Sequence, residues 1–154
     1  MVSAGKFNVS LSPNFCFTQF CCALTPIAIT VTNYPNLTGT PLKATIGGEG
    51  SSGNEQFILL TSTGLFAWGA EDMVLDTSLT SSAAFARISS PSNSESTGLP
   101  LGVSPSDVKM MVASFKTLSI LTNNGNVWVL NQLSNNIQGD GGSLSEITWR
   151  QVKR

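Results

Sequence analysis

Carboxylates are the first candidates for chemistry, because the 154-residue sequence contains no histidine. It therefore has neither the commonest general base nor the commonest metal ligand, and Ser-His-Asp or Cys-His machinery is excluded within this chain. The densest acidic group comprises Glu49, Glu55, Glu71, Asp72 and Asp76. Paired carboxylates can hydrolyse glycosides, but Glu71 and Asp72 are adjacent and would point to opposite faces of a strand. We expect a solvated loop here, no catalytic residue and no enzyme activity.

A glycine-rich run could in principle cradle a dinucleotide. Gly48-Glu49-Gly50-Ser51-Ser52-Gly53 spells G-x-G-x-x-G, and Asp72 follows at nearly the distance of a ribose contact. That chemistry requires a helix directly after the glycines, with its N-terminus facing the pyrophosphate. Residues 57–68 instead carry a β-hairpin pattern centred on Gly64. The run is predicted to be a loop between strands, and no cofactor is expected.

Two further segments contain metal-ligand types. Residues 134–141 form an Asn- and Gly-rich run with a single carboxylate, Asp140, which is too few for a tight calcium cage and favours a turn. The chain has three cysteines, Cys16, Cys21 and Cys22, so at least one thiol is unpaired within the chain. They are read first as small buried apolar residues, with a disulfide or a redox or metal role as alternatives. No metal site is predicted.

The three tryptophans are candidates for binding. Trp68, Trp128 and Trp149 would stack on sugars if they were exposed, but their positions on strands favour a place in the core. No binding residue is assigned from the sequence.

Composition indicates the elements that must position these residues. Charged residues make up only 11% of the chain, against roughly 25% in a typical soluble domain, and Ser, Thr, Asn and Gly take their place. This mixture is typical of many short strands joined by polar turns. The net charge is −1 and the basic residues are scattered, so no nucleic-acid partner is expected.

An apolar stretch over residues 15–31 is interrupted by Thr18, Gln19, Thr25, Pro26 and Thr30. It is a poor transmembrane helix and a poor signal peptide. It is predicted to form one or two buried strands, and no membrane span is expected.

The chain repeats itself at intervals of about 60 residues, within the range of propellers and other arrays. Residues 57–68 and 118–129 both read as an apolar strand, Leu-Thr, two small polar residues, Gly, and a second apolar strand. Residues 38–42 recur at 97–101, and residues 85–88 resemble 149–152, in the same order. Leu-Thr-x-x-Gly between two strands predicts a tight hairpin, in which Gly takes the position with positive φ.

Each unit of about four strands fits a propeller blade, which needs neighbours to cover its faces. Further short strands are expected at residues 85–88 and 108–112. The predicted repeats are residues 26–84 and 85–148. Residues 1–25 are predicted to be the tail of a preceding blade or an N-terminal strand segment, and residues 149–154 the first strand of a further repeat. The predicted fold is all-β: a partial β-propeller of about two four-stranded blades plus flanking strands.

The run Leu60–Gly69, with Leu-Thr, Gly64, Phe66 and Trp68-Gly69, resembles the repeat of the regulator of chromosome condensation family. The second copy matches at Leu121, Thr122, Gly125 and Val127, with Trp128 one step along the strand. Members of the family look like seven-bladed propellers. Val129 stands where the Trp-Gly pair would place its glycine, so the match is to the repeat architecture, and no functional residue is carried over.

The resemblance and the residue types together predict a non-catalytic β-propeller fragment that acts as a scaffold module. Its inter-strand loops would bind a protein or a polysaccharide. The alternative is a carbohydrate-binding module of an exported enzyme, which requires at least one exposed tryptophan. Bacterial proteins with such degenerate repeats are often large and surface-associated. The resemblance therefore implies the remaining blades of a longer parent chain, extracellular or at the cell surface.

Overall fold

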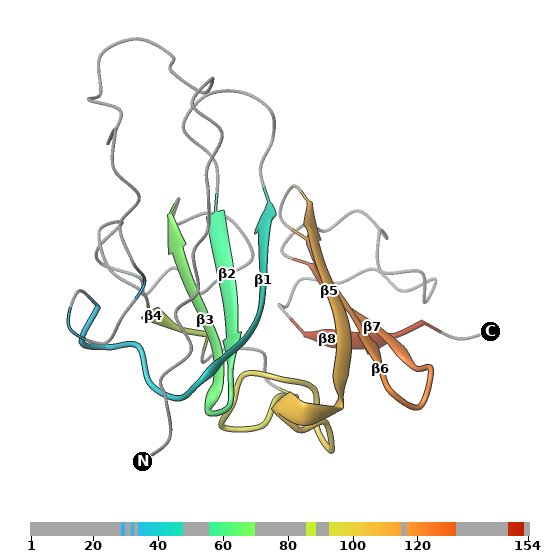
Figure 1. The fold of residues 1–154 in the computed structure, drawn as a ribbon. Coiled ribbons are helices and arrows are strands. Elements are labelled where there is room, and N and C mark those ends of the chain that lie inside the picture. The colour runs from blue at the N-terminus through green and yellow to red at the C-terminus, as the bar shows by residue number, and fades with distance from the viewer. Residues whose placement is uncertain are drawn as a thin grey trace, which may run out of the picture.

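Two four-stranded antiparallel sheets form the fold in a computed structural model (Figure 1), and residues 93–104 lie in the loop between them. The structure describes residues 29, 32, 34–47, 56–69, 86–88, 93–114, 117–131 and 148–152. The first sheet has the order β1 (Pro41–Gly47), β2 (Gln56–Thr61), β3 (Gly64–Gly69) and β4 (Ala86–Arg87). The second has the order β5 (Val108–Ser114), β6 (Thr117–Thr122), β7 (Val127–Asn131) and β8 (Trp149–Gln151), with a short 3-10 turn η1 (Pro105–Asp107) before it.

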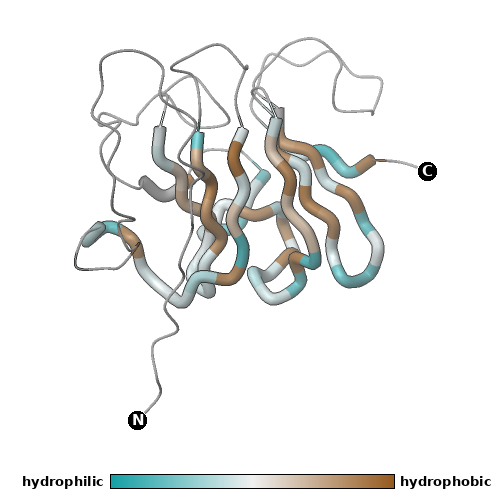
Figure 2. Tube along the Cα trace, turned by 45° about the horizontal axis from the view of Figure 1, so that its top comes forward, coloured by the Kyte–Doolittle hydropathy of each residue, from teal (hydrophilic) through white to brown (hydrophobic). Residues whose placement is uncertain are grey.

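Each sheet is a meander in chain order, and every pairing is antiparallel. The strands begin and end where the sequence changes from β-branched, aliphatic and aromatic residues to Ser, Thr, Asn and Gly. Figure 2 shows this change as brown strands that meet pale or teal turns. The prediction of an all-β fold with two four-stranded blades is confirmed, and the two sheets make a partial β-propeller.

Both predicted hairpins are present. In the first, Thr61 pairs with Gly64 across Ser62 and Thr63. Gly64 has a φ of 140°, in the region that favours glycine. The predicted strands at residues 85–88 and 108–112 correspond to β4 and β5.

The second hairpin has a longer turn than the sequence alignment implies. Leu121 pairs with Val127, and the Thr122 amide donates to the Asn126 carbonyl at 2.9 Å, so three residues remain in the turn. The third of them, Gly125, has a φ of 86°. By strand pairing, Trp128 lies opposite Ile120 and so takes the place that Phe66 has in the first sheet, two residues nearer the turn than the place of Trp68.

The two sheets pack against each other through one apolar core. It combines residues of β2 and β3 with residues of β5 to β8 and of the connecting loop. The fully buried members include Ile58, Leu60, Leu65, Leu99, Leu118, Leu130 and Trp149. The inner strands β1 and β5 lie side by side (Figure 1), and the Ala113 amide donates to Thr45 Oγ1 at 3.1 Å. Each sheet thus shields one face of the other from water, as the repeat predicts.

The opposite face of the first sheet has a smaller core of its own. Leu59 and Phe66 are buried there beneath Leu37, and Tyr34 packs at its edge. The segment before β1 therefore covers this face. No helix within the described ranges is long and apolar enough to cross a membrane.

The outer strands β4 and β8 each complete a sheet, by pairing with β3 and β7. The sequence repeat instead places these two strands at the beginning of the repeats that follow. Sequence repeat and sheet are therefore offset by one strand, and the repeat boundaries at residues 26–84 and 85–148 remain a prediction. The segment 1–25 lies outside the described residues, and of residues 149–154 the structure describes 149–152.

Candidate binding pocket at the end of the second sheet

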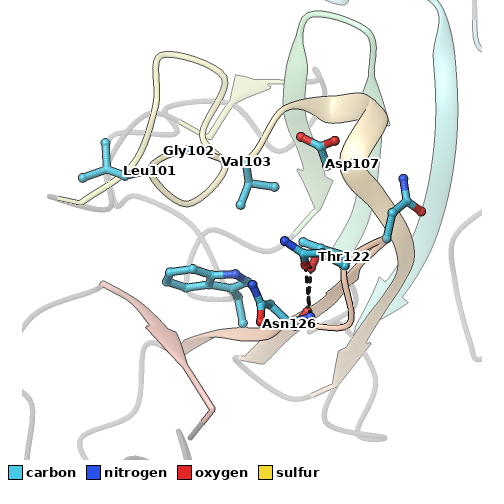
Figure 3. Close-up of a pocket in the computed structure, with 9 residues that line it drawn as sticks. Leu101, Gly102, Val103, Asp107, Thr122 and Asn126 are labelled. Carbon is cyan, nitrogen blue, oxygen red and sulfur yellow. Dashed lines mark hydrogen bonds between the residues drawn. The ribbon is translucent and has the colours of Figure 1, made fainter.

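A pocket of about 270 Å³ lies where the loop between the two sheets meets the turn of the second hairpin. Figure 3 shows Leu101, Gly102 and Val103 of the loop on one side of the space, with Thr122 and Asn126 of the turn on the other. The remaining lining residues are Asp107, Asn123, Asn124 and Trp128. Apolar loop side chains and hydrogen-bonding turn side chains therefore face a common space, the mixture found in ligand sites.

The loop side of the pocket is fixed by hydrogen bonds within the loop. The Gly102 amide donates to Glu95 Oε1 at 2.8 Å, and the Val103 amide donates to the Pro100 carbonyl at 3.0 Å. Val103 is buried, whereas Leu101 is 59% exposed, the highest value among the large apolar side chains of the described residues. The Leu101 side chain thus stands in solvent beside the pocket, and hydrogen bonds fix the backbone on its C-terminal side.

Asp107 belongs to the 3-10 turn that begins at Ser104. Its Oδ2 atom accepts hydrogen bonds from the Ser104 hydroxyl at 2.6 Å and from the Ser104 amide at 2.9 Å. These two bonds lower the pKa of Asp107 below its usual range, because they stabilise the carboxylate. Asp107 is therefore ionised at neutral pH, and it is the one charged residue among those that line the pocket.

The turn of the second hairpin, on the other side of the pocket, is fixed by hydrogen bonds to the segment before β5 and by hydrogen bonds within the turn. The Asn123 amide donates to the Asp107 carbonyl at 2.8 Å, and Asn123 Nδ2 donates to the Ser106 carbonyl at 3.0 Å. Within the turn, the buried Thr122 hydroxyl donates to the Asn126 carbonyl at 3.0 Å. The Asn126 amide donates to Asn124 Oδ1 at 3.2 Å. The pocket is thus bounded by two rigid, mutually bonded segments.

The three tryptophans occupy three different environments. Trp149 is 1% exposed and belongs to the core between the sheets, as its strand position predicts. Trp128 is half-buried, packs against that core and lines the pocket. The prediction of a core position is wrong for Trp68, which is 38% exposed. It pairs with Phe57 near the end of β3, beyond the buried part of the smaller core, and the ring of Tyr34 lies beside it, at 6.4 Å between centroids.

Most of the other candidates from the sequence lie outside the described residues. These are the glycine run 48–53, the carboxylates Glu49, Glu55, Glu71, Asp72 and Asp76, the run 134–141, and Cys16, Cys21 and Cys22. Within the described part, no three Cys, Asp or Glu residues lie close enough together to hold a metal ion. The sequence did not predict the pocket. The one available signal was the excess of amide side chains in the run Asn123-Asn124-Gly125-Asn126, where a turn requires at most one.

Searches against family models and against curated proteins give no match. Solved structures do match. One is Prp20p from Saccharomyces cerevisiae, described with its binding to Gsp1p and histones, at 19% identity and a TM-score of 0.47. Another is yeast RCC1 (Prp20) bound by Kap60, at 17% identity and a TM-score of 0.44.

In both comparisons 75% of this chain is covered, and it spans about a quarter of the length of the matched protein. Both matched structures are regulator of chromosome condensation β-propellers, the family whose repeat the sequence resembles.

Proposed function

We propose that this chain is a non-catalytic β-propeller module that serves as a scaffold and binds a protein partner through the loops around the pocket. The observation that carries the proposal is the surface formed by Leu101 and the pocket beside it. Leu101 stands largely in solvent on a loop whose backbone is fixed by Glu95 and Pro100. A rigid apolar anchor next to a pocket lined by hydrogen-bonding groups is the pattern of a protein-recognition site.

The proposal is tested by photo-crosslinking from position 101. Leu101 is replaced by a photoreactive phenylalanine analogue, and the chain is irradiated in an extract of its source cells. Ile46 gives the matched control. It is an apolar side chain that is 50% exposed, but it lies on β1 and is not among the residues that line the pocket. We expect a defined protein adduct from position 101 that position 46 does not give, identified by mass spectrometry. Equal adducts from both positions, or only glycan adducts from 101, would contradict the proposal.

A carbohydrate-binding module is the second candidate, and one observation favours it. Trp68 is 38% exposed, and the Tyr34 ring lies beside it with an interplanar angle of 53°. An exposed tryptophan with a half-buried aromatic ring beside it can stack on a sugar ring. Trp68→Ala should then abolish the quenching of tryptophan fluorescence by glycans, whereas Trp128→Phe should leave it. If no glycan quenches the wild-type fluorescence, this candidate is rejected.

A further inference from the structure

The pairing register gives each residue of the first sheet a counterpart in the second. Thr61 on β2 and Thr122 on β6 each pair with the first residue of the inner strand, β1 or β5. In both sheets the inner strand then has one extra residue before the next pair. Leu60 therefore corresponds to Leu121, and the correspondence continues residue by residue along the paired strands.

The two sheets meet through unlike faces. The first sheet contributes Ile58 and Leu60 of β2 to the shared core. The second sheet contributes Leu118 and Ile120 of β6, and the counterpart of Ile120 is Leu59, on the opposite face of the first sheet. A contact between unlike faces can be repeated from one copy of a protein to the next, because one copy carries both kinds of face. We call the face of each sheet that is turned away from the other sheet its outer face.

The outer face of the second sheet is apolar at positions that the first sheet buries. Leu121 and Val127 pair with each other there, and both are half-buried. Their counterparts, Leu60 and Leu65, are fully buried in the shared core. Val112 lies on the same outer face, on β5, and is 45% exposed. Exposed apolar side chains that are gathered on one face indicate a contact surface.

The outer face of the first sheet shows the same difference in burial. Ile46, Phe57 and Trp68 form one row across β1, β2 and β3. Ile46 is 50% exposed and Trp68 is 38% exposed. The corresponding row of the second sheet packs in the shared core and consists of Ala113, Leu118 and Leu130. Each outer face thus matches a face that is already packed within the chain.

The segment before β1 covers part of the outer face of the first sheet. Leu37 is buried there with Leu59 and Phe66, whereas the row that contains Ile46 remains partly exposed. The loop before β5 likewise contributes Leu99 to the core between the two sheets. A covering segment is therefore compatible with a sheet that packs beside it.

We propose that this chain assembles head to tail with a second copy of itself, so that the outer face of the second sheet packs against the outer face of the first sheet of the next copy. The inner strands specify the contact. Within the chain, the Ala113 amide donates to Thr45 Oγ1 at 3.1 Å. The counterpart of Thr45 is Val112, and that of Ala113 is Ile46. Between copies, two exposed apolar side chains therefore meet where a hydrogen bond joins the sheets within one chain.

The experiment is sedimentation velocity of the purified chain over a range of concentrations. We expect the average mass of the wild-type chain to rise with concentration. Ile46→Glu and Val112→Glu each place a carboxylate in the apolar contact, and each should raise the dissociation constant of self-association about a hundredfold, because an unpaired charge is costly to bury. Gln151→Glu is the matched control, since it adds the same charge at an exposed position on the other face of the second sheet. It should associate like the wild type, and circular dichroism verifies the fold of every variant.

A mixture of the two variants distinguishes unlike faces from like faces. The Ile46→Glu chain keeps the outer face of its second sheet, and the Val112→Glu chain keeps that of its first sheet. Each alone should stay monomeric where the wild type assembles, and the mixture should form a dimer that grows no further. Association of either variant alone, or no dimer in the mixture, overturns the proposal.

A wild-type chain that stays monomeric at every concentration also overturns the proposal, and it leaves the two outer faces to a further blade or to a different protein. The photoreactive group at position 46 gives an independent measurement, because its adduct should be a second copy of this chain. The partner sought from position 101 is a different protein, so failure of self-association and failure of the proposed function are read separately.

Discussion

Trp149 ties the second sheet to the loop that is bonded to the first sheet, and its removal should destabilise the whole fold. The side chain is 1% exposed, and its Nε1 donates to the Gly98 carbonyl at 2.9 Å. The same segment reaches the first sheet through the Thr97 carbonyl, which accepts from the Leu65 amide at 2.8 Å. The indole is therefore part of the link between the two sheets.

The magnitude follows from the burial and the bonds. Trp149→Ala should lower the free energy of unfolding by about 3 to 5 kcal/mol, the usual cost of deleting a buried aromatic side chain. Trp149→Phe keeps most of the apolar area but leaves the Gly98 carbonyl without its donor, at about 1 to 3 kcal/mol. Asn93→Ala removes two other bonds, from Asn93 Nδ2 to the Trp149 carbonyl at 2.7 Å and from the Trp149 amide to Asn93 Oδ1 at 2.8 Å. It should cost about 1 to 3 kcal/mol.

The assay is urea denaturation followed by far-ultraviolet circular dichroism. Trp68→Ala is the matched control, because it removes the same side chain from a position that is 38% exposed. We expect Trp149→Ala to lower the midpoint far more than the control, and both sheets to unfold in one transition. Two results would refute the view that Trp149 couples the sheets. One is an equal fall in the urea midpoint for Trp149→Ala and Trp68→Ala, and the other is a variant in which one sheet unfolds alone while the other changes little.

Two further predictions concern the loop and the turn. Gly98 has a φ of 80°, and a Cβ there would collide with the Ile88 carbonyl, whereas Gly125 has a φ of 86° with open space around it. Gly125→Ala should therefore lower the free energy of unfolding by about 1 to 2 kcal/mol through backbone strain, and Gly98→Ala should lower it clearly more. Equal urea midpoints for the two variants would contradict this prediction, because they would show that the Gly98 collision is relieved at no cost. Ser104→Ala should raise the pKa of Asp107, because the Ser104 hydroxyl is the main cause of its depression. Since the folded pKa lies below the unfolded one, ionised Asp107 stabilises the fold above the unfolded pKa, and this stabilisation is lost as the pH falls through the folded pKa. The measurement is a pH titration of the Asp107 carboxyl carbon by nuclear magnetic resonance. An unchanged pKa of Asp107 in the Ser104→Ala variant would disprove that the Ser104 hydroxyl lowers it.

The sequence by itself determined the local elements. Leu-Thr-x-x-Gly between apolar runs requires a hairpin, because a nearby glycine supplies the positive φ of the turn and the flanking residues suit a pleated surface. The recurrence of this pattern predicted two sheets that need each other, and the shared core around Ile58 and Leu118 has that form. The hairpins depend on residues that are close together in the chain, so the pattern is sufficient to predict them.

The tertiary structure alone decided which face each tryptophan meets and where a pocket lies. Trp68 and Trp128 both lie on strands of similar composition, yet one is exposed near the end of β3 and the other lines the pocket. The difference arises from their places along the strands, since Trp128 lies two residues nearer its turn than Trp68 does in pairing register, and from which distant segment covers each face. Register and cover depend on contacts between residues far apart in sequence, and their free energies are settled only when the sheets pack.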